Sequence, residues 1–292
     1  MPGKKRFWFG PAGKPISMKK SAKIEQAPAF LRELGLDAME YEAVRGVKIS
    51  ESKARRLGEE AEKHGVVLSL HAPYYINLAS TEEEKRKASI RRVIDSMKAA
   101  EWMGAYAVVV HTGYYKGYKD RREALRVAIE SYKEALEGLP SWVRKPDISP
   151  EVMGRKQAIG DIEEVIEICR ELGSRCRPTI DWAHLYARYE GQRVTSVDDV
   201  ISVIEAFEKE LGSRVLRPLH THFSKIEYGP GGEREHHILS EEEYGPEWAI
   251  VCKAYVETGI EAVIISESPV LEQDALVMKK KCSEIAPEAV GL

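Results

Sequence analysis

The chain is poor in amide side chains and in long apolar runs. It contains a single asparagine, Asn77, and four glutamines among its 292 residues. This scarcity of thermolabile amides, together with 31% charged residues, indicates a high-temperature source and carries no information about function. Because no run of 18 apolar residues occurs, we expect no segment of the chain to span a membrane.

Cysteine is also scarce. No CxxC spacing relates the four cysteines, which are Cys169, Cys176, Cys252 and Cys282. The N-terminal MPGKKRFWFG lacks the long apolar stretch of a signal peptide. Together these features predict a reduced, cytoplasmic protein in which the cysteines are small buried residues.

The charge balance gives no global sign of nucleic-acid binding. The formal net charge is −3, whereas domains built to bind nucleic acid are often strongly basic. A local basic rim remains compatible with the 44 lysines and arginines. The hydrophobic content of 43% suffices for a sizeable core, and the length fits one large α/β domain or two small ones.

Strand-like and helix-like segments alternate along the whole chain. The predicted strands are 6–10, 37–41, 66–71, 105–111, 147–152, 177–181, 215–222 and 261–266. The amphipathic segments between them begin near Lys19, Ser50, Thr81, Asp120, Asp161, Ser196, Ser240 and Leu271. Capping boxes support the starts at Thr81, Ser196 and Ser240, where an acid follows the hydroxyl by three residues.

Eight βα units in about 290 residues predict an α/β fold, a single (β/α)8 TIM barrel over residues 1–292. An open doubly wound sheet is the alternative, and it usually carries a glycine-rich phosphate turn after its first strand. The GPAGK segment at 10–14 lacks the third glycine and does not lead directly into a helix. The barrel is therefore preferred.

Histidines concentrate where the predicted strands end. Only His64, on a predicted helix, lies elsewhere. Barrels of this type gather their active sites at the C-terminal ends of the strands, so residues distant in sequence converge over one mouth. The strand-end histidines are His71, His111, His184, His220, His222, His236 and His237.

Acidic residues share these positions: Glu151, Asp181 and Glu267 each close or follow a strand. A lone histidine at a strand end is more often a hydrogen-bonded structural residue, and a lone acid at a helix start is usually a cap. Six strand ends together are harder to explain in that way, because buried carboxylates are costly unless paired or metal-bound. The sequence therefore predicts a metal site at the C-terminal face of the barrel.

The donor types indicate which metal. Histidine nitrogen mixed with carboxylate oxygen, without thiolate, suits zinc, with manganese or iron as alternatives. These candidate ligands outnumber what one four- or five-coordinate ion needs, so two to three ions sharing carboxylates fit better. Closely spaced ions of this kind suit phosphodiester cleavage.

Six motifs, in order over about residues 66–270, resemble those of one family, endonuclease IV, the zinc-dependent apurinic/apyrimidinic endonucleases. They are HAPYYINL, VVVHTG, EVMG, DWAHLYA, HTHFSK and ISESP. These motifs differ from the family pattern at two positions: Thr112 occurs where proline is usual, and Val152 replaces a threonine.

The resemblance implies a set of zinc ligands. His220 is chosen because its distance to Lys225 matches the family segment, which leaves His222 at an asparagine position facing the lumen. The implied ligands are His71, His111, Glu151, Asp181, His184, His220 and Glu267.

The loop after the seventh strand departs from the family pattern. An Asp-x-His pair is usual there, whereas this chain has EREHH at 233–237. Aligning on Leu239 makes Glu233 and His236 the preferred ligand pair. Glu235 with His237 is the alternative.

The resemblance further implies an endonuclease acting on double-stranded DNA, which it cuts on the 5′ side of abasic sites. A single-domain enzyme of this kind has no need to assemble, so we expect a monomer. Glu151 would be the catalytic residue, bridging two metals and orienting the attacking hydroxide. Tyr74 and Tyr75 are expected to form a wedge in the gap left by the flipped nucleotide, and Arg45 is a further candidate for it. Lys225 is expected to meet a phosphate, and His222 to line the mouth.

A metal-dependent sugar isomerase or epimerase on the same barrel is the main rival. Such an enzyme would need only Glu151, Asp181, His220 and Glu267. His71, His111 and His184 would then be surplus, which places this reading second. A non-catalytic protein that binds sugar or nucleic acid is third.

Overall fold

Eight parallel strands run through the centre of the computed structural model, which describes residues 6–291. Each lies within or beside one of the eight predicted strand segments, so the predicted strand order is confirmed. The strands are β1 (Phe7–Pro11), β2 (Ala38–Glu42), β3 (Val67–His71), β4 (Ala107–Val110), β6 (Asp147–Pro150), β8 (Thr179–Asp181), β9 (Leu219–Phe223) and β12 (Ala262–Ser266).

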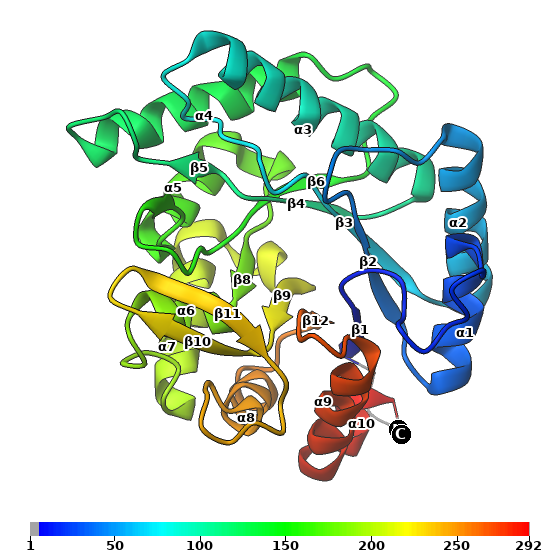
Figure 1. Cartoon of the computed structure of the whole chain (residues 1–292). Coiled ribbons are helices and arrows are strands. Elements are labelled where there is room, and N and C mark those ends of the chain that lie inside the picture. The colour runs from blue at the N-terminus through cyan, green and yellow to red at the C-terminus, as the bar shows by residue number, and fades with distance from the viewer. Residues whose placement is uncertain (1–5, 292) are drawn as a thin grey trace.

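The strands form two four-stranded parallel sheets, in the orders β1-β12-β9-β8 and β2-β3-β4-β6. Isolated parallel bridges link the sheets at both seams: Ala12 pairs with Glu40 beside β1 and β2, and Glu151 pairs with Thr179 beside β6 and β8. Consecutive strands are therefore neighbours around the ring, as in the predicted TIM barrel. Helices surround this ring on the outside (Figure 1).

Each strand is followed by a helix that packs on the outer surface of the barrel. Two helices begin later than predicted. The first begins after Gln26, with Pro28 in its opening turn, where proline is well accepted. The seventh begins after Pro246, because the residue before a proline disfavours helical geometry. The main helices are α1 (Ala27–Leu34), α2 (Glu51–His64), α3 (Glu83–Met103), α4 (Arg121–Glu137), α5 (Ile162–Leu172), α7 (Val197–Leu211), α8 (Trp248–Thr258) and α9 (Glu272–Ile285).

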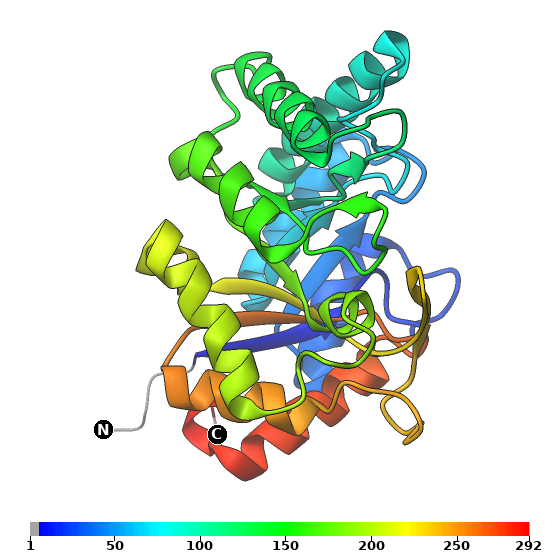
Figure 2. The same ribbon diagram turned by 90° about the vertical axis from the view of Figure 1, so that its left-hand side faces the viewer.

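Short elements decorate the end of the barrel toward which the strands run. A hairpin of β10 (Lys225–Gly229) and β11 (Gly232–His237) replaces the loop expected after the seventh strand. Ile226 of this hairpin packs on α6 (Trp182–Arg188), and the hairpin lies on the strand-end side of the barrel (Figure 2). The remaining short elements are β5 (Gly113–Tyr114), β7 (Ala158–Ile159), α10 (Pro287–Val290) and the 3-10 turns Ile24–Gln26, Gly173–Arg175 and Ser213–Leu216.

The barrel interior is unusually polar. Alternate residues of a strand point to the same side, and on these strands the inward positions carry polar side chains. Strand pairing arranges these side chains in two rows. In the lower row, Glu40 is level with Ser69, and His220 is level with Thr179. Two residues further toward the strand ends, the upper row contains His71, and His222 level with Asp181. All of these residues are buried. The upper row is where the strands end, and it holds the candidate site.

The cysteines correct one prediction. All four are buried as expected, but they form two disulfides, Cys169–Cys176 and Cys252–Cys282, and are not free thiols. The second disulfide ties α8 to α9, and the first ties α5 to the segment before β8. Sequence spacing could not reveal these pairs, because they depend on which faces of neighbouring elements meet. The argument for a reduced compartment therefore no longer holds, since disulfides persist in oxidising compartments and inside hyperthermophiles.

One further expectation concerns membranes. Among residues 6–291, we find no helix that combines the length and the apolarity needed to cross a bilayer.

The two disulfides should contribute unequally to stability. A disulfide stabilises mainly by restricting the unfolded chain, and the restriction grows with the length of the loop closed. We expect replacement of both Cys252 and Cys282 by alanine, 30 residues apart, to lower the free energy of unfolding by roughly 3 kcal/mol. The same change at Cys169 and Cys176, seven residues apart, should cost about 2 kcal/mol. Guanidinium denaturation measures both, and a larger loss from the shorter loop would contradict this account.

Candidate metal centre

A single carboxylate lies at the middle of the upper row. Glu151 is fully buried, directly after β6. Its Oε2 is 2.8 Å from His111 Nε2 and 3.4 Å from His71 Nε2. Its Oε1 is 3.1 Å from His222 Nδ1 and 3.3 Å from His184 Nδ1. Burial alone would raise the pKa of Glu151, but the neighbouring His111 and His222 rings hold it well below its ordinary value.

Three groups of potential ligand atoms meet around this carboxylate, with the atoms of each group within 4.8 Å of one another. Glu151 belongs to two of the groups and Glu267 to two, so each could be shared between neighbouring ions. The groups are His71, His111 and Glu151; Glu151, Asp181, His222 and Glu267; and His184, His236 and Glu267.

The donors fit bound metal ions. Imidazole nitrogen mixed with carboxylate oxygen is a donor set for zinc, manganese or iron. Several buried donor atoms in the groups have no hydrogen-bond partner among the described residues, among them His71 Nε2, Glu151 Oε2 and Asp181 Oδ2. An unsatisfied buried polar atom is costly, and a bound metal ion would satisfy these donor atoms.

Asp181 combines two roles. Its Oδ1 accepts a hydrogen bond of 2.8 Å from the backbone N–H of His184 and caps the short helix α6. Its Oδ2 stays unbonded and lies 3.5 Å from His184 Nδ1 and 4.0 Å from His222 Nδ1. The cap therefore fixes the orientation of the carboxylate and leaves one oxygen for the cluster.

The two histidines of β9 lie at different depths inside the barrel. His222 is level with Asp181, and its Nδ1 lies 3.2 Å from Glu267 Oε1 as well as beside Glu151. His220 lies one row deeper, level with Thr179, where its ring nitrogens contact Tyr106 and Glu40. His222 thus belongs to the four-donor group around Glu151, whereas His220 belongs to a deeper group with Glu40 and His222. The choice of His220 from its distance to Lys225 stays a prediction.

The hairpin brings the preferred acid and histidine pair to the cluster. Glu233 Oε2 is 3.5 Å from His184 Nε2, and His236 Nε2 is 4.0 Å from Glu267 Oε2. Three residues apart on a regular strand, Glu233 and His236 would face opposite sides. A bulge around Arg234, shown by the shift in pairing between β10 and β11, turns both toward the mouth.

The alternative pair points elsewhere. Glu235 and His237 gather with Glu227 in a separate group at the surface of the hairpin. His237 Nδ1 is 3.0 Å from Glu241 Oε2, and its ring stacks on Tyr244. The structure therefore favours Glu233 with His236 for the third group.

Two acids on β2 escaped sequence reasoning. Glu40 is fully buried beneath the cluster, and Glu42 lies at the edge of the mouth, where its Oε2 accepts a 2.9 Å hydrogen bond from Tyr74. Burial, partly offset by His71, raises the pKa of Glu42 to about 7. The sequence AMEYE could have indicated both acids, because residues two apart on a strand face the same side. Glu42 is level with His71 of the next strand, so both acids face the barrel interior together with His71.

Among the predicted substrate-binding residues, Tyr74, Tyr75 and Arg45 are accessible, whereas Lys225 is buried. Tyr74 lies against His71, with ring centroids 4.6 Å apart, while Tyr75 is half exposed and carries the Arg92 guanidinium over its ring. Arg45 is exposed in the loop after β2. Lys225, in contrast, is buried, donates to the carbonyl of Glu241 and pairs with Glu247, so the structure does not present it at the mouth.

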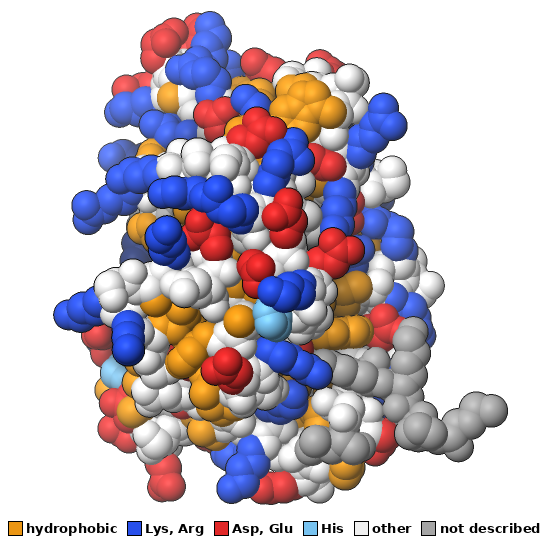
Figure 3. Space-filling model, turned by 90° about the vertical axis from the view of Figure 1, so that its right-hand side faces the viewer, with side chains coloured by type: hydrophobic (Ala, Val, Ile, Leu, Met, Phe, Trp, Pro, Cys, Tyr) orange, Lys and Arg blue, Asp and Glu red, His pale blue; other side chains and the backbone are white. Residues whose placement is uncertain are grey.

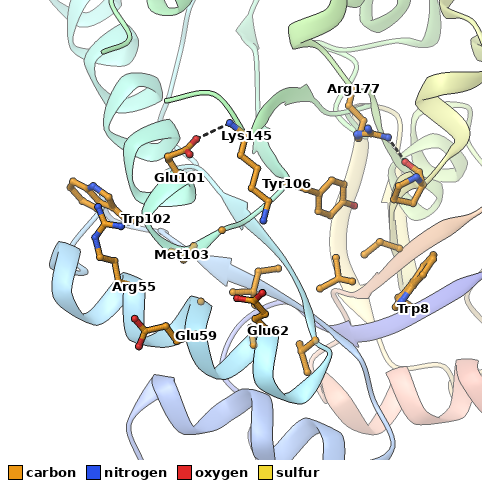
Figure 4. A pocket seen from close by; sticks show the side chains of 18 residues that line it. Trp8, Arg55, Glu59, Glu62, Glu101, Trp102, Met103, Tyr106, Lys145 and Arg177 are labelled. Atoms are coloured by element: carbon orange, nitrogen blue, oxygen red, sulfur yellow. Dashed lines mark hydrogen bonds between the residues drawn. The ribbon is translucent and has the colours of Figure 1, made fainter. Parts of the chain in front are cut away.

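Two sizeable cavities lie at opposite ends of the barrel. One of about 520 Å³ is the mouth itself, lined by residues that include Glu42, Tyr74, His111, Arg155 and His236. The other, of about 700 Å³, lies below the barrel between α2, α3 and the beginnings of the strands (Figure 4). None of the candidate metal ligands lines the lower cavity. The candidate metal ligands therefore lie at the mouth and not at the lower cavity.

Comparison with known proteins agrees with this architecture. The family model described as xylose isomerase-like TIM barrel matches residues 28–281. An uncharacterized protein of Methanocaldococcus jannaschii is 37% identical over 278 residues, 95% of this chain and 97% of that protein. The probable endonuclease 4 of Aquifex aeolicus is 26% identical over 174 residues, 58% of this chain and 59% of that protein.

Solved structures show the same fold in more than one kind of enzyme. A D-tagatose 3-epimerase-like protein superposes with a TM-score of 0.71 at 22% identity, covering 98% of this chain and 100% of that one. Endonuclease IV from Thermus thermophilus superposes with a TM-score of 0.69 at 20% identity, covering 96% of this chain and 99% of that one. At these identities the likeness establishes the fold alone.

The positions of the two β9 histidines lead to a direct test. We expect His222→Gln, measured by metal analysis after zinc loading and dialysis, to lose about one ion per chain, because the group of four donors loses its only nitrogen. His220→Gln should keep the wild-type zinc content, since His220 belongs to none of the three donor groups around Glu151. The reverse pattern would restore the original assignment.

Proposed function

Because the chain belongs to the xylose isomerase-like TIM barrel family, we propose that its metal centre hydrolyses a phosphodiester bond of double-stranded DNA on the 5′ side of an abasic site. The observation that carries the proposal is the presence of three donor groups joined through Glu151 and Glu267. Phosphoryl transfer benefits from several neighbouring ions, because the attacking and the leaving oxygen can be stabilised together.

The residues that would hold the ions follow from the three groups, with Glu233 added to the third. Zinc is the preferred ion, two to three per chain, with manganese or iron as alternatives. When bound, such ions lower the pKa of water toward neutrality and neutralise charge on the phosphate. The proposed ligands are His71, His111, Glu151, Asp181, His184, His222, Glu233, His236 and Glu267.

In the proposed reaction, the oxygen of a water molecule bonds to phosphorus, the bond to the leaving 3′ oxygen breaks, and that oxygen takes a proton. The lowered pKa of Glu151 keeps this carboxylate ionised, so it can accept a hydrogen bond from the attacking water and orient it. Arg155, at the rim beside Glu233, can meet the negative charge of the phosphate.

Recognition of an abasic site would use the shape of the mouth. A nucleotide without a base costs little to flip out of the helix, because it neither stacks nor pairs. Tyr75, half exposed and backed by Arg92, would fill the vacated gap. Basic and acidic side chains are interspersed on the side face drawn in Figure 3. All proposed ligands come from one chain, which fits a monomer, and DNA as substrate fits a cytoplasmic site.

A metal-dependent sugar epimerase is the second candidate. Glu151, Asp181, His222 and Glu267 alone form a four-donor site for one ion. The mouth, at about 520 Å³, also has the volume of a small-molecule site. This candidate ranks second because it gives no role to the group around His71 and His111 or to the pair on the hairpin.

Incision of a defined duplex tests the nuclease proposal. Zinc-loaded protein should cut an oligonucleotide duplex that carries one tetrahydrofuran abasic analogue on the 5′ side of the lesion. Glu151→Gln should slow incision by roughly 10²–10⁴-fold while retaining the fold by circular dichroism. Metal-replete wild-type protein that leaves this duplex intact, yet epimerises a ketohexose, would establish the rival function.

The hairpin offers a matched pair of variants. Glu233→Gln should slow incision of the same duplex, because its carboxylate faces His184. Glu235→Gln makes the same chemical change two residues away on the exposed side of the bulge and should leave the rate unchanged. Equal effects of the two variants would show that the bulge does not select Glu233.

The proposed wedge can be tested by binding. Tyr75→Ala should weaken binding of the abasic duplex by about tenfold, the value of one lost stacking contact of ~1–3 kcal/mol. Tyr75→Phe retains the ring and should bind as the wild type does. Fluorescence anisotropy with the Glu151→Gln background prevents cleavage during the measurement. Unchanged affinity of the alanine variant would leave Tyr75 as a packing residue.

A further inference from the structure

The outer face of the hairpin carries a further group of potential metal ligands. β10 and β11 form a two-stranded ribbon separate from the barrel sheets, and one face of this ribbon brings Glu233 and His236 to the mouth (Figure 1). On its other face, one ligand atom each of Glu227, Glu235 and His237 lies within 4.8 Å of the other two. None of these three residues belongs to the donor groups at the mouth.

Two like charges meet across the ribbon in this outer group. Glu227 of β10 is paired in register with Glu235 of β11, and like charges directly opposite each other destabilise a pair of strands. Arg234 compensates part of this charge, with its Nη1 2.9 Å from Glu227 Oε1. Glu235 has no such partner among the described residues. The ribbon therefore keeps an excess of negative charge where its strands meet.

His237 turns this pair of acids into a mixed donor set. Its Nδ1 lies at hydrogen-bond distance, 3.0 Å, from Glu241 Oε2, and an ionised carboxylate can only accept. In the neutral ring the proton is therefore on Nδ1, and the lone pair is on Nε2. Nε2 is buried, and no described residue gives it a hydrogen bond. A bound cation would satisfy both this nitrogen and the two carboxylates.

Glu241 and Tyr244 hold the ring of His237 in place. Glu241 Oε2 also accepts a 3.0 Å hydrogen bond from the backbone N–H of Ile238, so the carboxylate behind the ring is itself fixed. The ring of Tyr244 stacks on that of His237 with a centroid distance of 3.7 Å. Metal-ligating histidines commonly donate their second N–H to a carboxylate, which orients the ring. The nitrogen ligand of the outer group is therefore preorganised.

We propose that Glu227, Glu235 and His237 bind a divalent transition-metal ion, separate from the ions of the mouth. Two carboxylate oxygens and one imidazole nitrogen suit zinc or manganese, with water in the remaining positions. Because its ligands come from both strands, this ion links β10 to β11. A two-stranded ribbon on its own is marginally stable, and an ion that binds only the folded ribbon stabilises it.

The outer ion takes no part in the proposed reaction. The hairpin is anchored independently of it, through Ile226 on α6 and through the 2.7 Å contact between Ser224 Oγ and His236 Nδ1. Loss of the outer ion should therefore leave the incision rate unchanged, in agreement with the expectation for Glu235→Gln. The inference goes beyond the proposed function and does not rest on it.

Counting bound zinc by competition with a chromophoric chelator tests the proposal without substrate. Glu227→Gln and His237→Gln should each bind about one zinc ion fewer per chain than the wild type at the same free zinc concentration. Glu243→Gln makes the same acid-to-amide change at an exposed residue outside the group and should bind the wild-type number. Wild-type zinc content in both Glu227→Gln and His237→Gln, or an equal loss in Glu243→Gln, would overturn the proposal.

The nitrogen bonded to metal provides a second measurement, on unaltered protein. In ¹¹³Cd-loaded, ¹⁵N-histidine-labelled protein, His237 should couple to cadmium through Nε2 and carry its proton on Nδ1. Protein in which the histidines of the mouth couple to cadmium and His237 does not would contradict the proposal. Because neither measurement involves DNA, a failure to incise the abasic duplex would count against the proposed function alone.

Discussion

The burial of Glu151 is the constraint on which the site depends. A carboxylate with no solvent exposure must be compensated by charge or by metal, and here four histidine rings from β3, β9, α6 and the segment after β4 approach its two oxygens. No short stretch of chain could deliver four rings to one point. The barrel does so because parallel strands bring their C-terminal ends to a single rim.

The polar interior has a structural consequence. With acids and imidazoles inside the barrel, apolar stabilisation comes mainly from the interface between the strands and the surrounding helices, where Phe7, Phe9 and Trp182 are fully buried. Two disulfides reinforce that outer layer between α8 and α9 and beside α5. The arrangement gives a rigid frame to an interior whose side chains are selected for chemistry more than for packing.

Much of this could be predicted from periodicity. Alternation along the strands indicated the eight βα units, and the strand-end positions of His71, His111 and Glu151 indicated where they would meet. Depth along a strand could not be predicted, because His220 and His222 both face inward and differ only by one step of register. Contacts across the barrel were equally hidden, as Glu40 shows, and so were the cysteine pairs and the burial of Lys225.

The choice between a nuclease and an epimerase reduces to how many ions the mouth is built to hold. The epimerase candidate uses only the group of Glu151, Asp181, His222 and Glu267, whereas the proposed nuclease also uses the donors around His71 and His184. Anomalous diffraction at the zinc edge from zinc-loaded crystals measures this directly. Separate peaks in the three donor groups, with Glu151 and Glu267 between them, are the predicted result. A single peak confined to the four-donor group, with His71, His111 and His236 bound to no ion, would contradict the account.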